Sequence, residues 1–436
     1  SAASDVYKRQ GFDMPKLLWV SPFNLHDTSS GAAVQARLML QKLAQRGVSV
    51  RVLGSFCFDS MAGAKSHFPK LEEEMKESSK KSALNFNQNG IDYTYLPCAS
   101  INMGEMTHDE SWKLFSRFCS MLSTFRPDVC MGYGMGCLGT AIHAECRRRA
   151  IPHAYPIFNG NHPYYNFFDS DLLFTDSDAN AHLYGMRDRL NLATTGIFVN
   201  KEDYVADEKD KTAEYITMIN PEPRKGGGIF AKIALIAQKD PELKNEKFLC
   251  VNSRGHFSAT INALKDSKGK GLEAAMFENV QMAENTRNMK GIYAMTKLLL
   301  APSVPNFWYE GWGRVASEAV LNRIPVLVAK NGGLEQAMAG AGIALEVPKS
   351  VNEDMLALPS DDEIKPWVDA LKKLLKDKKA GAMEPAFDEA EKALDIERST
   401  DRAMEMLAPL FAKKASQNPH LFINGNLRLD ISGNIK

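Results

Sequence analysis

The feature that most constrains the fold is a regular alternation of short apolar segments and longer segments with helical periodicity, which begins near Lys16. Residues 17–20 are apolar, residues 34–43 place apolar side chains at helical spacing, and residues 48–53 form another apolar run. Strands that alternate with helices in this way are typical of βαβ units. The chain is therefore predicted to be an α/β protein with doubly wound parallel sheets.

The same alternation continues through most of the 436 residues, which are enough for two hydrophobic cores. Further strands are predicted over residues 91–96, 129–132, 154–158, 172–175, 215–219, 248–251, 298–301 and 324–329. Charge rises over residues 201–211, which we interpret as a linker. We expect an N-terminal domain over residues 14–200, a second domain over 201–384 and a long helix over 385–412.

Composition excludes several classes of partner. Lys plus Arg equals Asp plus Glu at 53 each, so no basic field is expected to hold a nucleic acid. Seven cysteines without a close C-x-x-C pair indicate reduced thiols and a cytoplasmic protein. Apolar runs are too short to span a membrane, although peripheral contact with its inner face stays open. Residues 1–13 resemble a non-native leader that ends before Met14.

Two glutamates, Glu310 and Glu318, lie eight positions apart across a glycine-rich loop that enters a predicted helix. A helix start offers unpaired N–H donors and partial positive charge to a phosphate. A carboxylate near it can accept hydrogen bonds from vicinal ribose hydroxyls. The alternative is that both acids are solvated surface residues. The flanking buried strands and the second glycine pair at Gly332 favour a nucleotide-sugar site.

This region resembles the retaining GT-B glycosyltransferases of family 4, the glycosyltransferase group 1 type. The resemblance rests on Pro302-Ser303, Glu310-Gly311-Trp312-Gly313, Glu318, Pro325-Val326 and Gly332-Gly333-Leu334-Glu335. Trp312 stands where the family has phenylalanine, and Arg323-Ile324 replaces its glycine strand entry. The resemblance implies two Rossmann-like domains that face a cleft, with the acceptor on the first and the nucleotide-sugar on the second. It further implies that the helix over residues 385–412 crosses back to the first domain. It also implies transfer of a sugar from a nucleotide-diphosphate donor to an acceptor hydroxyl, with retention of configuration.

The resemblance also implies roles for individual residues. Glu310 would contact the sugar, and Glu318 the ribose. Lys225, at a glycine-rich helix start, would neutralise the diphosphate. The family's second cation is missing, because Asn220 occupies its place, and either Arg224 or Arg254 would replace it. The remaining candidates are His162 beside the acceptor and a backbone cradle at Gly31, Gly311, Trp312 and Gly313.

Neither a metal nor a cofactor is expected, because lysine and helix termini can carry the phosphate charge. The donor's sugar and base remain open, and so does the oligomeric state. The acceptor could be a glycan, a lipid or a small molecule.

Two other functions also stay open. One is a catalytically weak relative that only binds nucleotide or glycan, as the missing arginine suggests.

The other function is that of a nicotinamide-dependent oxidoreductase, because Gly134 to Gly139 reads G-x-G-x-x-G after a predicted strand. Against it, the expected acid about twenty residues further on is absent, since the chain there reads His153-Ala154-Tyr155-Pro156. A tight strand-to-helix turn is the alternative interpretation of these glycines.

Overall fold

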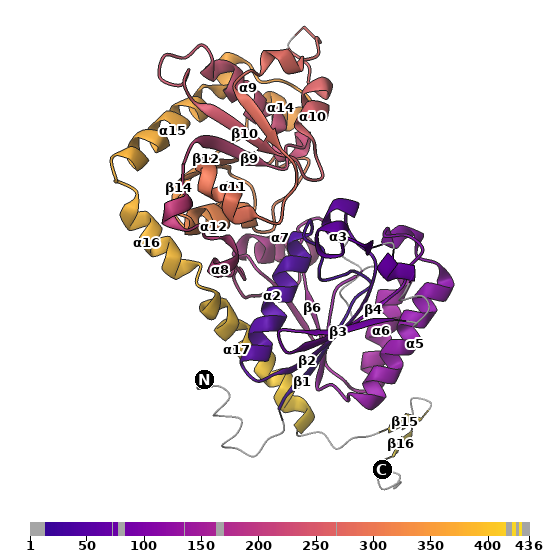
Figure 1. Cartoon of the computed structure of the whole chain (residues 1–436). Helices are drawn as coiled ribbons and strands as arrows, with labels where there is room; N and C mark the ends of the chain where they lie inside the picture. The colour runs from indigo at the N-terminus through magenta and orange to yellow at the C-terminus, as the bar shows by residue number, and fades with distance from the viewer. Residues whose placement is uncertain are drawn as a thin grey trace.

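The computed structural model describes residues 14–71, 73–76, 83–134, 136–162, 170–266, 268–415, 421–423 and 427–429. The predicted leader over residues 1–13 lies outside this range. The described residues form two large sheets with helices packed against them, one from each half of the chain, as Figure 1 shows. A small antiparallel hairpin near the end of the chain pairs β15 (Leu421–Ile423) with β16 (Leu427–Leu429).

The first sheet has the described strands in the order β3-β4-β2-β1-β5-β6-β7-β8, and every pair is parallel except β3 with β4. These strands are β1 (Lys16–Val20), β2 (Ser49–Ser55), β3 (Leu84–Gln88), β4 (Ile91–Leu96), β5 (Val129–Met131), β6 (His153–Pro156), β7 (Leu172–Thr175) and β8 (Ala193–Thr194). The helices around them are α2 (Gly31–Gln45), α3 (Met61–His67), α5 (His108–Thr124), α6 (Cys137–Arg148) and α7 (Asp178–Asp188).

The second sheet is parallel throughout, in the order β11-β10-β9-β12-β13-β14. Its strands are β9 (Tyr215–Ile219), β10 (Lys247–Val251), β11 (Val280–Ala283), β12 (Thr296–Ala301), β13 (Val326–Ala329) and β14 (Gly342–Leu345). The helices of this half are α8 (Lys201–Tyr204), α9 (Gly227–Ala237), α10 (Phe257–Ala263), α11 (Met289–Met295), α12 (Arg314–Leu321), α13 (Leu334–Met338), α14 (Lys349–Glu353) and α15 (Asp361–Lys379).

Strand order positions the candidate site. In the first sheet β1 lies between β2 and β5, and in the second β9 lies between β10 and β12, so the order reverses beside each of these strands. Ligands of open α/β sheets bind at such reversals, in the crevice at the carboxyl ends of the strands. The loops that follow β1, β9 and β12 are therefore the segments expected to hold a ligand.

The end of the chain differs from the single helix expected over 385–412. Two helices, α16 (Glu384–Ala393) and α17 (Ile396–Ala415), run from the second half back to the first, as Figure 1 shows. Ala403, Leu407 and Phe411 of α17 join the core of the first sheet. Lys42 and Arg46 of α2 pair with Glu397 at 2.6 and 2.7 Å. Apolar burial and ion pairs thus fasten α17 to the first half.

The predicted strands in the described part of the chain are present, with ends shifted by up to two residues. Sequence reasoning missed β3, β8, β11 and β14 of the two large sheets, and the hairpin strands β15 and β16. The first four lie at sheet edges, and β8, β11 and β14 have half-buried or exposed side chains instead of an apolar run. No described helix combines the length and apolar character needed to cross a bilayer.

Candidate functional site

A cavity with a volume of about 720 Å³ separates the two halves of the chain and is lined by residues from both. It receives the loop after β1, the start of α2, the loop after β9 and the segment from β12 into α12. All the residues that sequence analysis singled out for the proposed site line this cavity: Gly31, His162, Arg224, Lys225, Arg254, Glu310, Gly311, Trp312, Gly313 and Glu318.

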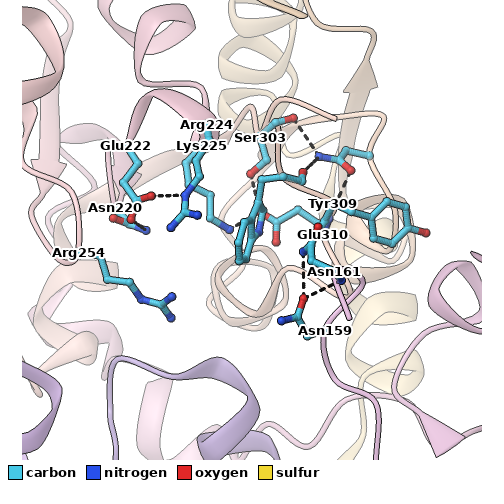
Figure 2. Close-up of polar contacts among 12 residues, drawn as sticks. Asn159, Asn161, Asn220, Glu222, Arg224, Lys225, Arg254, Ser303, Tyr309 and Glu310 are labelled. Atoms are coloured by element: carbon cyan, nitrogen blue, oxygen red, sulfur yellow. Dashed lines mark hydrogen bonds and ion pairs between the residues drawn. The ribbon is translucent and has the colours of Figure 1, made fainter. Parts of the chain in front are cut away.

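Glu310 lies in the loop between β12 and α12, and its carboxylate is held from two sides. The same oxygen, Oε1, accepts two hydrogen bonds, one from the Lys225 ammonium at 2.6 Å and one from the Ser303 hydroxyl at 2.5 Å. Figure 2 shows the Lys225 and Glu310 side chains directed toward each other. Burial alone would raise the pKa of Glu310, but the Lys225 charge and these hydrogen bonds outweigh it and lower the pKa. Glu310 is therefore ionised at neutral pH.

Lys225 is fixed by the tight entry into α9. The next residue, Gly226, has φ of 88°, and a Cβ there would lie 2.1 Å from the carbonyl oxygen of Pro302. Only glycine allows this approach without strain. The loop that carries Glu310 and the helix start that carries Lys225 are thus packed backbone to backbone.

Trp308 adds an aromatic surface that sequence analysis did not single out. The Arg224 guanidinium lies 4.4 Å from the ring centroid and the Lys225 ammonium 4.9 Å from it, which are cation–π distances. Arg224 also pairs with Glu222. The signal available in the sequence was a tryptophan two positions before the loop glutamate Glu310. Its contact with the two cations is seen only in the structure.

Glu318 is on α12 and only 5% exposed. One carboxylate oxygen accepts a hydrogen bond from the Tyr293 hydroxyl at 2.6 Å, and the other lies 3.5 Å from Nε of Arg314. Burial raises the pKa of Glu318, although the Arg314 charge opposes this. The second oxygen keeps acceptor capacity for a ligand hydroxyl.

Arg314 ties α12 to the first half of the chain. Its Nη1 donates to the carbonyl oxygen of Phe198 at 2.9 Å and to Oε1 of Gln35 at 3.1 Å. Its Nη2 is buried and has no hydrogen-bond partner in the described part of the chain. Sequence analysis did not single out the Arg314 side chain, because a side chain that bridges two sheets leaves no local pattern.

The glycines of the predicted cradle line the cavity, and the Trp312 ring has a structural contact in addition. Gly31 begins α2, and Gly313, with φ of 101°, is the cap of α12. The Trp312 indole is buried and donates to the Ser317 hydroxyl at 2.9 Å. The carbonyl of Gly311 accepts a hydrogen bond from the Ser177 hydroxyl at 2.5 Å. Trp312 therefore contributes its backbone to the cavity while its ring supports α12.

His162 lies at the cavity wall formed by the first half. Its backbone N–H donates to the Tyr184 hydroxyl at 3.1 Å, and its carbonyl accepts from Arg187 at 2.7 Å. Burial lowers the pKa of His162 to about 4, with a further effect of the Arg187 charge. The imidazole is therefore neutral at pH 7. Nearby, Asn161 donates to the carbonyl of Tyr309 at 3.2 Å, which links the two walls beside Glu310 (Figure 2).

Asn220, which stands where the resembling family has an arginine, supports the neighbouring loop. It has φ of 62°, and its side-chain oxygen accepts the backbone N–H of Gly255 at 2.8 Å. Arg254, in the loop that Asn220 supports, donates to the carbonyl of Ser29 at 2.7 Å and lies 3.4 Å from Asp59. Arg254 thus reaches across the cavity to the first half, whereas Arg224 stays on the wall of Lys225.

The described members of the Gly134 to Gly139 pattern do not line the cavity. Gly136, with φ of 89°, begins α6, and a Cβ on Gly139 would lie 2.8 Å from the carbonyl of Gly134. Tight strand-to-helix geometry accounts for these two glycines. Within the described residues, no three His, Cys, Asp or Glu side chains are grouped to hold a metal ion. The expectation of a metal-independent reaction stays a prediction.

Comparison with known proteins extends these observations. Residues 217–405 match the family model described as "Family 4 Glycosyltransferase in conflict systems". No curated protein matches the sequence. A sucrose-phosphate synthase from Thermosynechococcus elongatus is 12% identical with a TM-score of 0.64, over 92% of this chain and 100% of that one.

Two further solved structures share the architecture. A glycosyltransferase from Rickettsia africae is 12% identical with a TM-score of 0.62, over 92% of this chain and 99% of that one. Anabaena HepE in complex with UDP-glucose is 14% identical with a TM-score of 0.60, over 90% of this chain and 99% of that one. These likenesses confirm the predicted fold class, two Rossmann-like α/β domains that face a cleft.

Proposed function

We propose that this chain, a GT-B protein of the family 4 glycosyltransferase type, transfers a sugar from a nucleoside diphosphate donor to an acceptor hydroxyl with retention of configuration. The observation that carries this proposal is the 2.6 Å contact between Lys225 and Glu310 in the cavity that also contains the buried Glu318. A cation for a leaving diphosphate and a carboxylate for a reacting sugar are thereby placed side by side.

The donor would bind along the second half of the chain. Lys225 would contact the diphosphate, with Arg224 as the second cation because both lie against the Trp308 ring. Glu318 would accept a ribose hydroxyl through the carboxylate oxygen that Tyr293 does not use. The N-terminal amides of α2 and α12, at Gly31 and beyond Gly313, would complete the cradle.

Chemistry would proceed by substitution on one face of the sugar. The bond between the anomeric carbon and the diphosphate oxygen breaks, and the acceptor oxygen bonds to the same face. The acceptor's proton passes to the departing phosphate. Lys225 stabilises the charge that grows on this phosphate. Glu310 stabilises the positive charge that develops on the sugar ring, and neutral His162 offers one hydrogen bond to the acceptor.

The test is a thermal-shift screen of nucleotide-sugars, followed by turnover assays of those that stabilise the protein. Release of nucleoside diphosphate in the presence of an acceptor supports the proposal. Glu310→Ala should abolish turnover while nucleotide binding is kept. The matched control is Glu353→Ala, since Glu353 is an exposed acid on α14 that does not line the cavity.

The same screen separates the alternatives. A parent protein that binds nucleotide but releases no diphosphate from any donor would be the catalytically weak relative. Stabilisation by NADH and not by UDP would point to an oxidoreductase. Because the described glycines of the Gly134 to Gly139 pattern lie outside the cavity lining, we expect NADH to have no effect.

A further inference from the structure

Two arginines from opposite halves of the chain line the cavity, and neither has an acidic partner among the residues that the structure describes. Arg37 is on α2, and Arg287 is in the loop between β11 and α11. The other arginines and the lysine of the cavity each have a carboxylate: Lys225 with Glu310, Arg314 with Glu318, Arg254 with Asp59 and Arg224 with Glu222. No ion pair joins Arg37 or Arg287 to an acid anywhere in the described residues.

These two arginines lie close enough to act on the same histidine. Burial, the Arg37 charge and the Arg287 charge together lower the pKa of His67 to about 4. Burial and the Arg37 charge also lower the pKa of Arg287. Like charges in a concave site of reduced dielectric repel each other and concentrate positive potential. Such an arrangement is unfavourable until an anion occupies it.

The adjacent histidines add hydrogen-bonding capacity and no charge. The His67 ring packs against His26, with centroids 4.3 Å apart. Both ring nitrogens of His26 are engaged, Nδ1 with the Tyr95 hydroxyl at 2.8 Å and Nε2 with Oε1 of Gln88 at 2.7 Å. Burial is the main cause that lowers the pKa of His26 to about 2. The cluster at pH 7 therefore consists of two permanent cations beside a neutral His67.

Two carboxylates that line the same cavity, Asp27 and Asp203, are committed elsewhere. Asp27 accepts the backbone N–H and the hydroxyl of Ser29 and the backbone N–H of Asp59, at 2.6 to 2.9 Å. Asp203 accepts a hydrogen bond from Asn200 at 3.2 Å. Neither acid pairs with Arg37 or Arg287 among the described residues. The positive potential of the two arginines thus remains available to a ligand.

We propose that the acceptor substrate carries an anionic group, a phosphate or a carboxylate, that binds between Arg37 and Arg287 with His67 as a further donor. This inference rests on the proposed function, since it names the acceptor of the same site. Planar guanidinium groups bind both anions through paired hydrogen bonds. Arg37 and His67 line the cavity from the first half of the chain, as His162 does. The proposed donor cations Lys225 and Arg224 line it from the second half. We therefore assign the anion to the acceptor.

The test is calorimetric titration of the full chain with glucose 6-phosphate, glucuronic acid, inorganic phosphate and uncharged glucose. The charged probes should bind and glucose should not. Arg37→Ala and Arg287→Ala should each weaken binding of the charged probes about tenfold or more, because each removes a charge-assisted contact. Arg117→Ala, which removes an exposed arginine on α5 outside the cavity, should leave binding unchanged. Equal binding of the charged probes to all variants would overturn the inference.

Titration of the same variants with UDP distinguishes this inference from the proposed function. Unchanged UDP affinity in Arg37→Ala and Arg287→Ala supports an acceptor site. A tenfold loss of UDP affinity with unchanged glucose 6-phosphate affinity would assign the arginines to the donor and overturn the inference. Absence of nucleotide binding in the parent protein, with anion binding retained, would refute the proposed function instead.

A nuclear magnetic resonance titration of His67 gives a readout that does not depend on turnover. An anion between the arginines should raise the His67 pKa from about 4 toward its ordinary value, because the repulsion is then compensated. Glucose 6-phosphate should produce this shift in the parent protein and in Arg117→Ala. An unmoved His67 resonance at saturating glucose 6-phosphate would contradict the assignment.

Discussion

The ammonium of Lys225 lies 2.6 Å from the carboxylate of Glu310, although 85 positions separate the two residues in the chain. Both side chains are largely buried at the wall of the cavity, where an unpaired ion is costly. Their contact lowers the pKa of Glu310 against the effect of burial, so Glu310 is ionised before any substrate arrives. It also places the proposed phosphate contact next to the proposed sugar contact, so the two ends of the glycosyl–phosphate bond would meet one preformed pair.

Lys225→Ala should lower turnover on the order of a hundredfold, because it removes the cation that stabilises the leaving diphosphate. It should also raise the pKa of Glu310, since the Lys225 charge now lowers that pKa against the effect of burial. The acidic limb of the turnover–pH profile should therefore move to higher pH. Lys232→Ala is the control, because Lys232 pairs with Asp361 outside the cavity. An unchanged acidic limb would argue against coupling of Lys225 and Glu310.

Arg224 and Arg254 should differ in their effect on nucleotide affinity. Arg224 shares the Trp308 ring with Lys225, so Arg224→Ala should weaken UDP binding about tenfold. Arg254 donates to the carbonyl of Ser29 across the cavity, so Arg254→Ala should weaken UDP binding only about twofold. Calorimetry with UDP measures both. The reverse order would make Arg254 the replacement for the missing family arginine.

Gly160→Ala should disturb the loop that carries Glu310. A Cβ at Gly160 would lie 2.1 Å from Cδ1 of Tyr309, so the ring next to Glu310 must move. Small displacements of reacting groups can cost up to about a hundredfold in rate. We expect kcat to fall while UDP affinity changes little. Gly185→Ala is the control, because a Cβ on Gly185 meets only an ordinary contact at 3.5 Å.

Acid should destabilise the protein through His26, which is fully buried. The unfolded chain binds a proton at this site near pH 6.5, but the folded chain does so only near pH 2. The unfolded state therefore binds more protons between these values, and stability falls as pH decreases below about 6.5. From pH 7 to pH 5 the loss is about 2 kcal/mol.

The prediction for His26 is checked by thermal unfolding of the parent and of His26→Gln at pH 7 and pH 5. The substitution removes the titrating group while keeping polar contacts possible. The melting temperature of His26→Gln should consequently fall less between these two pH values. An equal fall in both proteins would assign the acid sensitivity to other groups.

Sequence reasoning predicted the two-sheet architecture because buried parallel strands and amphipathic helices leave strong local patterns. It also predicted that Glu310, Glu318 and Lys225 share one site, since a glycine-rich turn at the end of a strand has a fixed place in such a sheet. It missed β14, whose four residues are only half-buried and carry no apolar alternation strong enough to detect.

Contacts between the two halves of the chain could not be predicted from the sequence. Arg314 bonds to Gln35 and Phe198, and Asn161 bonds to the backbone of Tyr309. These contacts depend on how one sheet is oriented against the other, which no local pattern encodes. For the same reason the unpaired charges of Arg37 and Arg287 become visible only when both walls of the cavity are in place.

The most direct test of the central claim is a crystal structure of the protein soaked with the nucleoside diphosphate sugar that stabilises it most. We predict phosphate oxygens within hydrogen-bond distance of Lys225, the ribose hydroxyls on Glu318 and the sugar beside Glu310. Density for the donor away from these three residues, or carboxylates of Glu310 and Glu318 turned from a bound donor, would contradict it.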